Sequence, residues 1–72
     1  NVPMNGKTKK VLLVEDEVVL LELLADKFKD SGFSVNTAQS AETGMKLALQ
    51  NHPDLILLDL ILPKMDGLTT KI

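Results

Sequence analysis

The chain has 72 residues, of which 44% are hydrophobic, and a formal net charge of −2 at pH 7, so it is one small folded domain or part of one, not a disordered segment. The lack of cysteine excludes a disulfide framework and a thiolate metal site, and it favours a reducing compartment such as the cytoplasm. All 8 basic residues are lysines and Trp and Tyr are absent, which argues against direct nucleic-acid binding, and no apolar run approaches the ~20 residues of a membrane span.

The first strand and the acids that follow it begin the folded part. Residues 1–9 are polar and rich in turn formers, so we expect a disordered lead-in or residues added for expression, with the folded part at residues 10–72. Apolar residues dominate Lys10–Val14, as in a buried strand. Three acids follow at Glu15–Glu17, and one of them is expected to cap the next helix, because acids are favoured at helix amino termini.

A helix and an edge strand are predicted next. Apolar residues recur at helical spacing along Val18–Ser31, which predicts a helix that packs on the core, and Gly32 is placed to end it. Apolar and polar residues alternate along Phe33–Ala38, which predicts a strand near the edge of the sheet.

The second helix is predicted over Ala41–Gln50, with Ser40 as its N-cap. Gly44 lies inside this helix, where glycine costs up to ~1 kcal/mol relative to alanine, so we expect a close approach between this helix and the sheet. His52 lies in the following turn, and nothing nearby in the sequence pairs with it, so we expect a solvated loop residue and not a catalytic or metal-binding one.

The chain is organised around Leu55–Gly67, which reads LILLDLILPKMDG. The apolar run at its start predicts a strand over Asp54–Asp59 that is buried on both faces. A carboxylate at the end of such a strand is costly for stability, and ligands bind at the carboxyl ends of strands in open α/β sheets, so Asp59 is predicted to carry chemistry. After the loop, Leu68–Ile72 is predicted to begin a third helix.

The alternation of strands and helices predicts an α/β fold with parallel strands joined by right-handed crossovers. If the first strand lies between the other two, in the order 2-1-3, the carboxyl ends of the first and third strands bring Glu15, Asp16 and Asp59 together. Three carboxylates at one site repel one another, so we expect a hard divalent cation there, with Mg²⁺ as the best fit. The backbone carbonyl of Ile61 is a further candidate ligand. A carboxylate beside Mg²⁺ can attack phosphorus and form an acyl phosphate.

Two motifs, VLLVEDE and PDLILLDLILPKMDG, make residues 10–72 resemble the receiver domain of bacterial two-component response regulators. The resemblance implies a flavodoxin-like α/β fold and a phosphoprotein of signal transduction. It implies that Asp59 accepts a phosphoryl group from the phosphohistidine of a sensor histidine kinase or a phosphotransfer protein. Such a module is not an enzyme, because it assists only its own phosphoryl transfer.

The resemblance also implies roles for the residues around the phosphoacceptor. Asp16 matches the acid that binds Mg²⁺ directly, and Glu15 matches the acid that holds the ion through water. Ile61 matches the position whose backbone carbonyl binds the metal. Pro63 and Gly67 match the turn that shapes the loop before the third helix.

The chain departs from the family in its length. A receiver has five strand–helix units, and we expect this chain to be truncated just inside the third helix. It then lacks the Thr or Ser of the fourth strand and the Lys of the fifth, a role that neither Lys64 nor Lys71 matches. The uncovered edge of the third strand predicts self-association, such as a homodimer. The alternative is that these residues are part of a longer, ordinary receiver chain.

Two other functions stay open at this point. A metal-dependent phosphohydrolase with an aspartyl nucleophile usually carries a second Asp two residues after the first, and this chain has Ile61 there. A non-phosphorylated interaction module, including a self-associating receiver fragment, is disfavoured by the complete set of Glu15, Asp16 and Asp59. The missing second half of the domain favours it.

Overall fold

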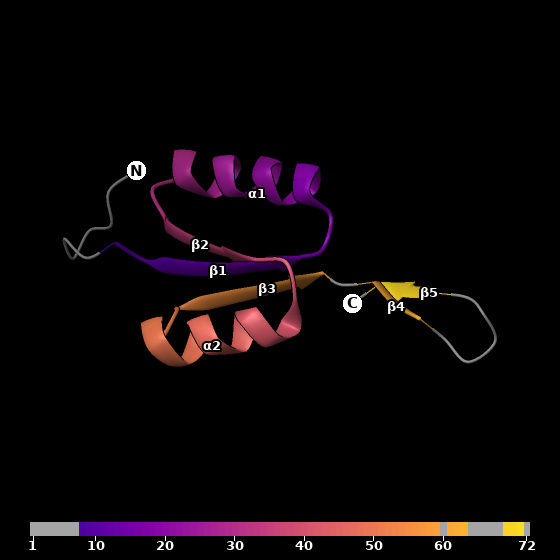
Figure 1. Ribbon diagram of the computed structural model, residues 1–72. Helices are drawn as coiled ribbons and strands as arrows, with labels where there is room; N and C mark the ends of the chain where they lie inside the picture. The colour runs from indigo at the N-terminus through magenta and orange to yellow at the C-terminus, as the bar shows by residue number, and fades with distance from the viewer. Residues whose placement is uncertain (1–7, 60, 64–68, 72) are drawn as a thin grey trace.

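The fold has three layers, with one helix on each side of a parallel sheet (Figure 1). The computed structural model of the chain describes residues 8–59, 61–63 and 69–71. Its elements in chain order are β1 (Lys10–Glu15), α1 (Val18–Asp30), β2 (Ser34–Ala38), α2 (Ala41–Asn51), β3 (Leu55–Asp59), β4 (Ile61–Pro63) and β5 (Thr69–Lys71). The three-stranded sheet has the order β2-β1-β3, and both strand pairs are parallel. The predicted flavodoxin-like α/β arrangement with its 2-1-3 order is confirmed.

β1 is the centre of the core because it is apolar on both faces. Its four residues Val11–Val14 are at most 3% exposed. The cluster on the α1 side consists of Val11, Leu13, Leu21 and Ala25, with Leu24, Phe28, Phe33 and Val35 packed against it. The cluster on the α2 side consists of Leu12, Val14 and Ala38, with Leu47 and Ala48 packed against it. Alternate residues of one strand therefore hold both helices on the sheet.

The helix ends agree with the predicted signals to within one residue. Gly32 follows α1 with a φ of 94°, a left-handed conformation that favours glycine, and its N–H donates to the carbonyl of Lys29 at 3.0 Å. Ser40 is the N-cap of α2, and its side chain accepts a hydrogen bond from the N–H of Thr43 at 3.2 Å. Of the helices that the structure describes, neither is long and apolar enough to cross a membrane.

β3 is much less covered than the sequence predicts. Its residues Leu55–Leu58 are between 37% and 51% exposed. The prediction that this strand is buried on both faces is wrong for this chain, because α1 and α2 pack mainly on β1 and β2 and leave β3 largely uncovered. Two apolar residues of α2, Met45 and Leu49, are exposed as well. An apolar run thus identified the strand correctly, but coverage depends on the elements that lie beside it.

The predicted third helix is replaced by a strand within the described residues. Thr69–Lys71 form β5, which pairs antiparallel with β4. The prediction that Leu68–Ile72 begins a helix is therefore wrong for these three residues. The two adjacent β-branched threonines, Thr69 and Thr70, favour extended backbone. The predicted turn at Gly67 lies outside the described residues.

Gly44 marks a close approach between α2 and the sheet, as the sequence predicts. This glycine is buried, and a Cβ atom built on it would lie 2.8 Å from Cγ2 of Val14. Real Cβ atoms essentially never come that close to another heavy atom. The missing side chain lets the helix pack directly on β1.

We expect Gly44→Ala to lower the free energy of unfolding by about 1 kcal/mol. Overpacking a core costs about 1–3 kcal/mol, and the better helix propensity of alanine returns about 1 kcal/mol. Urea unfolding followed by circular dichroism measures the change, and exposed Lys46→Ala on the same helix is the control. In a Val14→Ala background the same glycine substitution should no longer destabilise, and an equal loss in both backgrounds would contradict the contact.

Candidate functional site at the carboxyl ends of β1 and β3

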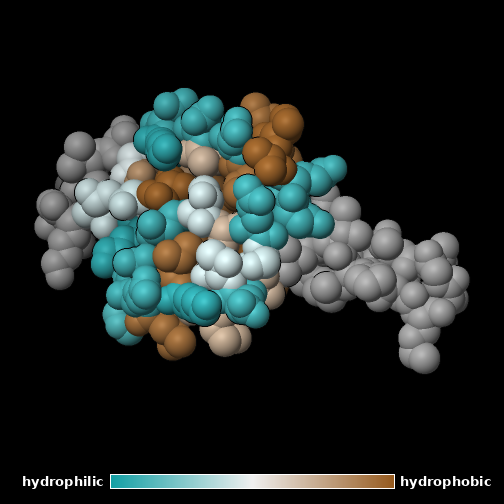
Figure 2. All heavy atoms as spheres, viewed as in Figure 1, coloured by the Kyte–Doolittle hydropathy of each residue, from teal (hydrophilic) through white to brown (hydrophobic). Residues whose placement is uncertain are grey.

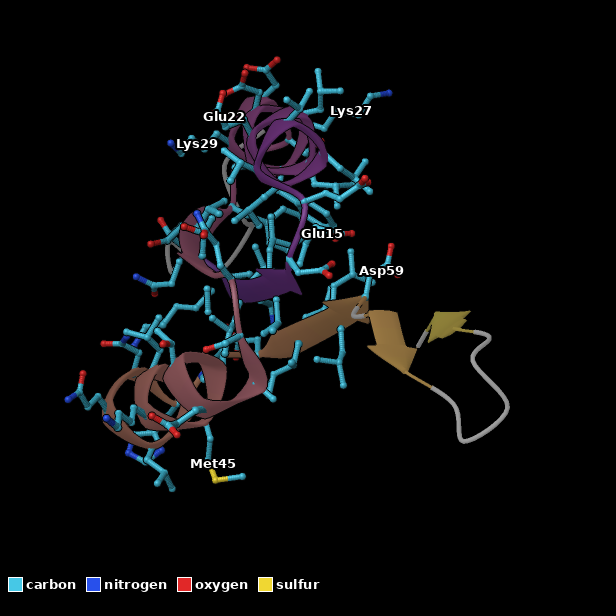
Figure 3. The ribbon with its side chains drawn as sticks, turned by 45° about the vertical axis from the view of Figure 1, so that its right-hand side comes forward. Glu15, Glu22, Lys27, Lys29, Met45 and Asp59 are labelled. Carbon is cyan, nitrogen blue, oxygen red and sulfur yellow. The ribbon has the colours of Figure 1, made fainter. Side chains whose placement is uncertain are left out.

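Two acids meet where β1 and β3 end. Glu15 is the last residue of β1, Asp59 is the last residue of β3, and the two are partners in the parallel register. Alternation along β1 places Glu15 on the same face as Leu13, which is the α1 side of the sheet. Figure 3 shows the two side chains next to each other at the ends of their strands. The structure brings these two residues together, as the 2-1-3 order requires.

Glu15 is a buried carboxylate with one oxygen bonded and one not. The residue is 1% exposed. Its Oε2 accepts a hydrogen bond from the backbone N–H of Glu17 at 2.9 Å, whereas buried Oε1 has no hydrogen-bond donor among the described residues. A buried acceptor without a donor is costly and needs an explanation. This oxygen therefore marks a place where a ligand or ion is expected.

The acids after β1 do not cap α1 in the expected way. Glu17 occupies the N-cap position, but its side chain makes no capping hydrogen bond. The prediction that one of these acids caps the helix is therefore wrong for the side chain of Glu17. The carboxylate of Glu15 takes up the N–H of Glu17 instead, because it ends β1 pointing toward the start of the helix.

The pKa of Glu15 is raised above its ordinary value of 4.5. The hydrogen bond from the N–H of Glu17 lowers this pKa, but burial and the neighbouring carboxyl groups of Asp16 and Asp59 together outweigh it. The buried position of Glu15 beside two other carboxyl groups therefore favours its protonated form.

The remaining predicted ligands differ in how the structure presents them. Asp16 is exposed in the bend between β1 and α1, and Asp59 is half-buried. Ile61 lies in β4, where its register partner is Lys71. Within the described residues, no group of three or more His, Cys, Asp or Glu side chains is arranged to hold a metal ion, so the metal site stays a prediction. Its donors are nonetheless carboxylate oxygens, which hard cations prefer.

The only histidine lies far along the sheet from these acids. His52 follows α2 with a φ of 48°, and its N–H donates to the carbonyl of Ala48 at 3.0 Å. It is exposed and lies before β3, whereas Asp59 ends that strand. The interpretation of His52 as a solvated turn residue agrees with this position.

An apolar surface beside the acids was not anticipated from the sequence. Val18, the first residue of the helix that was predicted to pack on the core, is 46% exposed, and Val19 and Leu23 are exposed even more. These residues line a shallow hollow together with Glu17. Figure 2 shows hydrophobic surface over the end of α1 from which the helix starts. The signal in the sequence was the pair Val19 and Leu23, one helical turn apart and outside the core stripe.

Comparison with known proteins matches nearly the whole chain to one family. The sequence profile of the response regulator receiver domain matches residues 11–71. Over 60 residues, 83% of this chain and 25% of the relative, the chain is 45% identical to the alkaline phosphatase synthesis transcriptional regulatory protein PhoP of Bacillus subtilis. Over 61 residues, 85% of this chain and 50% of the relative, it is 39% identical to the polar-differentiation response regulator DivK of Brucella ovis. The chain thus spans a quarter to a half of these relatives, and no solved structure matches it.

We expect Glu15→Gln to raise the free energy of unfolding at pH 7 in metal-free buffer. The folded-state pKa of Glu15 is raised, so the folded protein disfavours the ionised carboxylate. The free energy of unfolding is therefore highest with respect to this group below pH 4.5, where it is neutral, and falls as the pH rises through the folded-state pKa. Glutamine carries no charge at any pH, so the advantage of the variant should shrink toward zero below pH 4.5.

Urea unfolding at several pH values measures this difference. Glu22→Gln is the matched control, because Glu22 is exposed on α1 and its replacement should give a small difference that does not follow the same pH dependence. A Glu15→Gln chain that is less stable than the wild type at every pH would contradict the assigned environment.

Proposed function

The chain belongs to the response regulator receiver domain family, and we propose that it is the phosphoacceptor module of a bacterial two-component system. Asp59 is the proposed acceptor. We base this on one observation above all, the pairing of Asp59 with buried Glu15 at the carboxyl end of the sheet. The proposed donor is the phosphohistidine of a sensor histidine kinase or of a phosphotransfer protein, and the proposed location is the cytoplasm.

The proposed reaction uses the position of Asp59 more than any special reactivity. A carboxylate oxygen of Asp59 forms a bond to phosphorus while the bond from phosphorus to the donor nitrogen breaks, and the electron pair stays on that nitrogen. β3 holds the attacking carboxylate at the sheet edge, so the protein contributes mainly orientation. Asp59 is half-buried, which leaves it accessible to a donor. The chain assists only its own modification, and we do not propose turnover of a separate substrate.

We propose that the acids hold Mg²⁺, directly through Asp16 and Asp59 and through water from Glu15, with the backbone carbonyl of Ile61 as a further ligand. The unbonded Oε1 of Glu15 and the mutual effect of the three carboxyl groups support this assignment. A bound Mg²⁺ supplies positive charge that neutralises the phosphoryl oxygens and relieves the repulsion between the acids. The residues present thus fit a hard cation in both charge and ligand type.

The proposed contact surface for the donor protein is the exposed apolar start of α1. Val18, Val19 and Leu23 lie next to the acidic turn, so a partner that packs on them reaches the carboxylates as well. Exposed apolar residues beside a polar site are a common feature of protein-binding surfaces. A phosphodonor docked there would bring its histidine toward Asp59.

The direct test is transfer from a small donor. Incubation of the chain with Mg²⁺ and a small acyl phosphate should add one phosphoryl group, as measured by intact mass. Asp59→Ala should abolish the addition, and chelation of Mg²⁺ should reduce it strongly. Asp26→Ala, which removes an exposed carboxylate from α1, is the matched control and should accept the group normally. An addition that persists in Asp59→Ala, or none in the wild type, would overturn the proposed function.

The exposed face of β3 favours a second candidate, a self-associating module. A groove of about 350 Å³ between α2 and β3 is lined by Met45, Ile56 and Leu58 with almost no polar surface. We propose a second copy of the chain as its occupant, with the two β3 strands antiparallel about Leu57. This places Ile56 opposite Leu58 of the second copy, and it brings the acidic end of one sheet toward Lys10 of the other. A parallel arrangement would set acids against acids.

We expect light scattering at tens of micromolar to give about twice the chain mass of 7.9 kDa. Ile56→Lys should return the chain to a monomer, because it places a charge in the proposed interface. Leu23→Lys is the matched control on the other apolar surface and should leave the dimer intact. A monomeric wild-type chain, or a dimer that Ile56→Lys does not change, contradicts this second candidate.

A further inference from the structure

Lys10 and Asp54 are tied together at the end of the sheet opposite the acids. The backbone N–H of Lys10 donates to Oδ2 of Asp54 at 2.7 Å, and the N–H of Asp54 donates to the carbonyl of Lys10 at 2.8 Å. The Nζ of Lys10 also donates to the carbonyl of Asn51, the last residue of α2, at 3.1 Å. The first residue of β1 is therefore bonded three times to the segment that leads into β3.

The rest of β3 does little to define its own register against β1. Register is normally set by a pattern of apolar and polar residues, since a slip of one residue turns every side chain to the other face. Leu55–Leu58 are apolar at every position, so a slipped strand would still set apolar residues against β1. These residues are also more than one-third exposed, which weakens the packing that would otherwise select one register.

At the carboxyl end of β1 and β3, the contact between the two strands disfavours the observed register. There Glu15 and Asp59 are direct partners, and two carboxylates at such a position repel each other. Backbone bonds of a parallel ladder form equally well in other registers. The specific bond that distinguishes the observed register is the one from the N–H of Lys10 to the side chain of Asp54.

We propose that Asp54 is a positioning residue whose carboxylate sets the register of β3 on β1 and so places Asp59 opposite Glu15. Asp54 and Asp59 are five residues apart along an extended segment, about 16 Å at 3.3 Å per residue, so Asp54 acts through the strand and not by contact with the acceptor site. The consequence for phosphoryl transfer rests on the proposed function, whereas the consequence for strand register does not.

The experiment compares Asp54→Ala with Asp54→Asn in the whole chain. Asparagine keeps an oxygen that can accept from Lys10, and alanine does not. NMR cross-strand contacts between Glu15 and Asp59 should persist in Asp54→Asn and weaken or disappear in Asp54→Ala. The rate of phosphorylation by Mg²⁺ and a small acyl phosphate should fall about tenfold or more in Asp54→Ala, because small misplacements of reacting groups have large effects. It should stay within about threefold of the wild type in Asp54→Asn.

Two controls separate positioning from general stability. Ala25→Gly loosens the core under α1 without touching Lys10 or Asp54, so it should lower stability while the rate per folded molecule is kept. Asp26→Ala removes an exposed carboxylate elsewhere and should change neither quantity. Equal loss of rate in Asp54→Ala and in an equally destabilised Ala25→Gly would overturn the proposal, as would intact cross-strand contacts in Asp54→Ala.

A third measurement does not depend on the variants folding. In the wild-type chain the amide proton of Lys10 should exchange with solvent much more slowly than that of exposed Thr8. Equal exchange rates would overturn the inference by themselves. If the wild-type chain accepts no phosphoryl group, the proposed function fails, and the exchange rates and cross-strand contacts still decide whether Asp54 sets the register.

Discussion

The whole structure depends on one strand, β1, that is buried on both faces and paired on both edges. Its apolar residues alternate between the two helices, and its neighbours β2 and β3 have no other strand in the three-stranded sheet. A change in β1 would therefore reach every layer at once. Because β1 ends in Glu15, the same burial that stabilises the fold carries a carboxylate into the interior. The packing of the core and the position of the candidate site therefore both depend on β1.

The pair of carboxylates at Glu15 and Asp59 destabilises the folded state. Among the described residues no donor reaches Oε1 of Glu15, and Glu15 lies opposite a second carboxylate. Both features cost free energy in the absence of a cation. The remainder of the sheet offsets this cost through the apolar packing of β1 and the bonds between Lys10 and Asp54. Local cost at one place and compensation at another is typical of functional sites. The position of these carboxylates is therefore not explained by their contribution to stability.

Much of this arrangement could be predicted from the sequence, because its signals are local. The apolar run Lys10–Val14, the helix end at Gly32 and the cap at Ser40 each have a short-range physical cause. The meeting of Glu15 with Asp59 followed from topology, since right-handed parallel connections leave few arrangements.

The features that the sequence did not reveal depend on contacts between distant residues. The exposure of β3 depends on what lies beside it, which an apolar run does not encode. The bonds between Lys10 and Asp54 join residues 44 positions apart and have no periodic signature. A helix was predicted at Leu68–Ile72 as the next element after the loop, whereas the threonines at its centre form a strand with Ile61–Pro63. Local propensity favours the strand there, because the two adjacent threonines are β-branched.

The apolar start of α1 and the apolar groove between α2 and β3 lie on opposite faces of the sheet, and Glu15 and Asp59 lie at the end of the strands between them. If two copies pair through β3, Asp59 of one copy comes opposite Leu55 of the other, at the edge of the new ladder. The proposed phosphorylation of Asp59 would add charge at that edge, so association and phosphorylation would each change the equilibrium of the other by the same factor. The start of α1 lies on the opposite side of Glu15 and stays outside such a pair. Under the proposed function, a donor protein that packs on the start of α1 therefore reaches the acids whether or not β3 is paired.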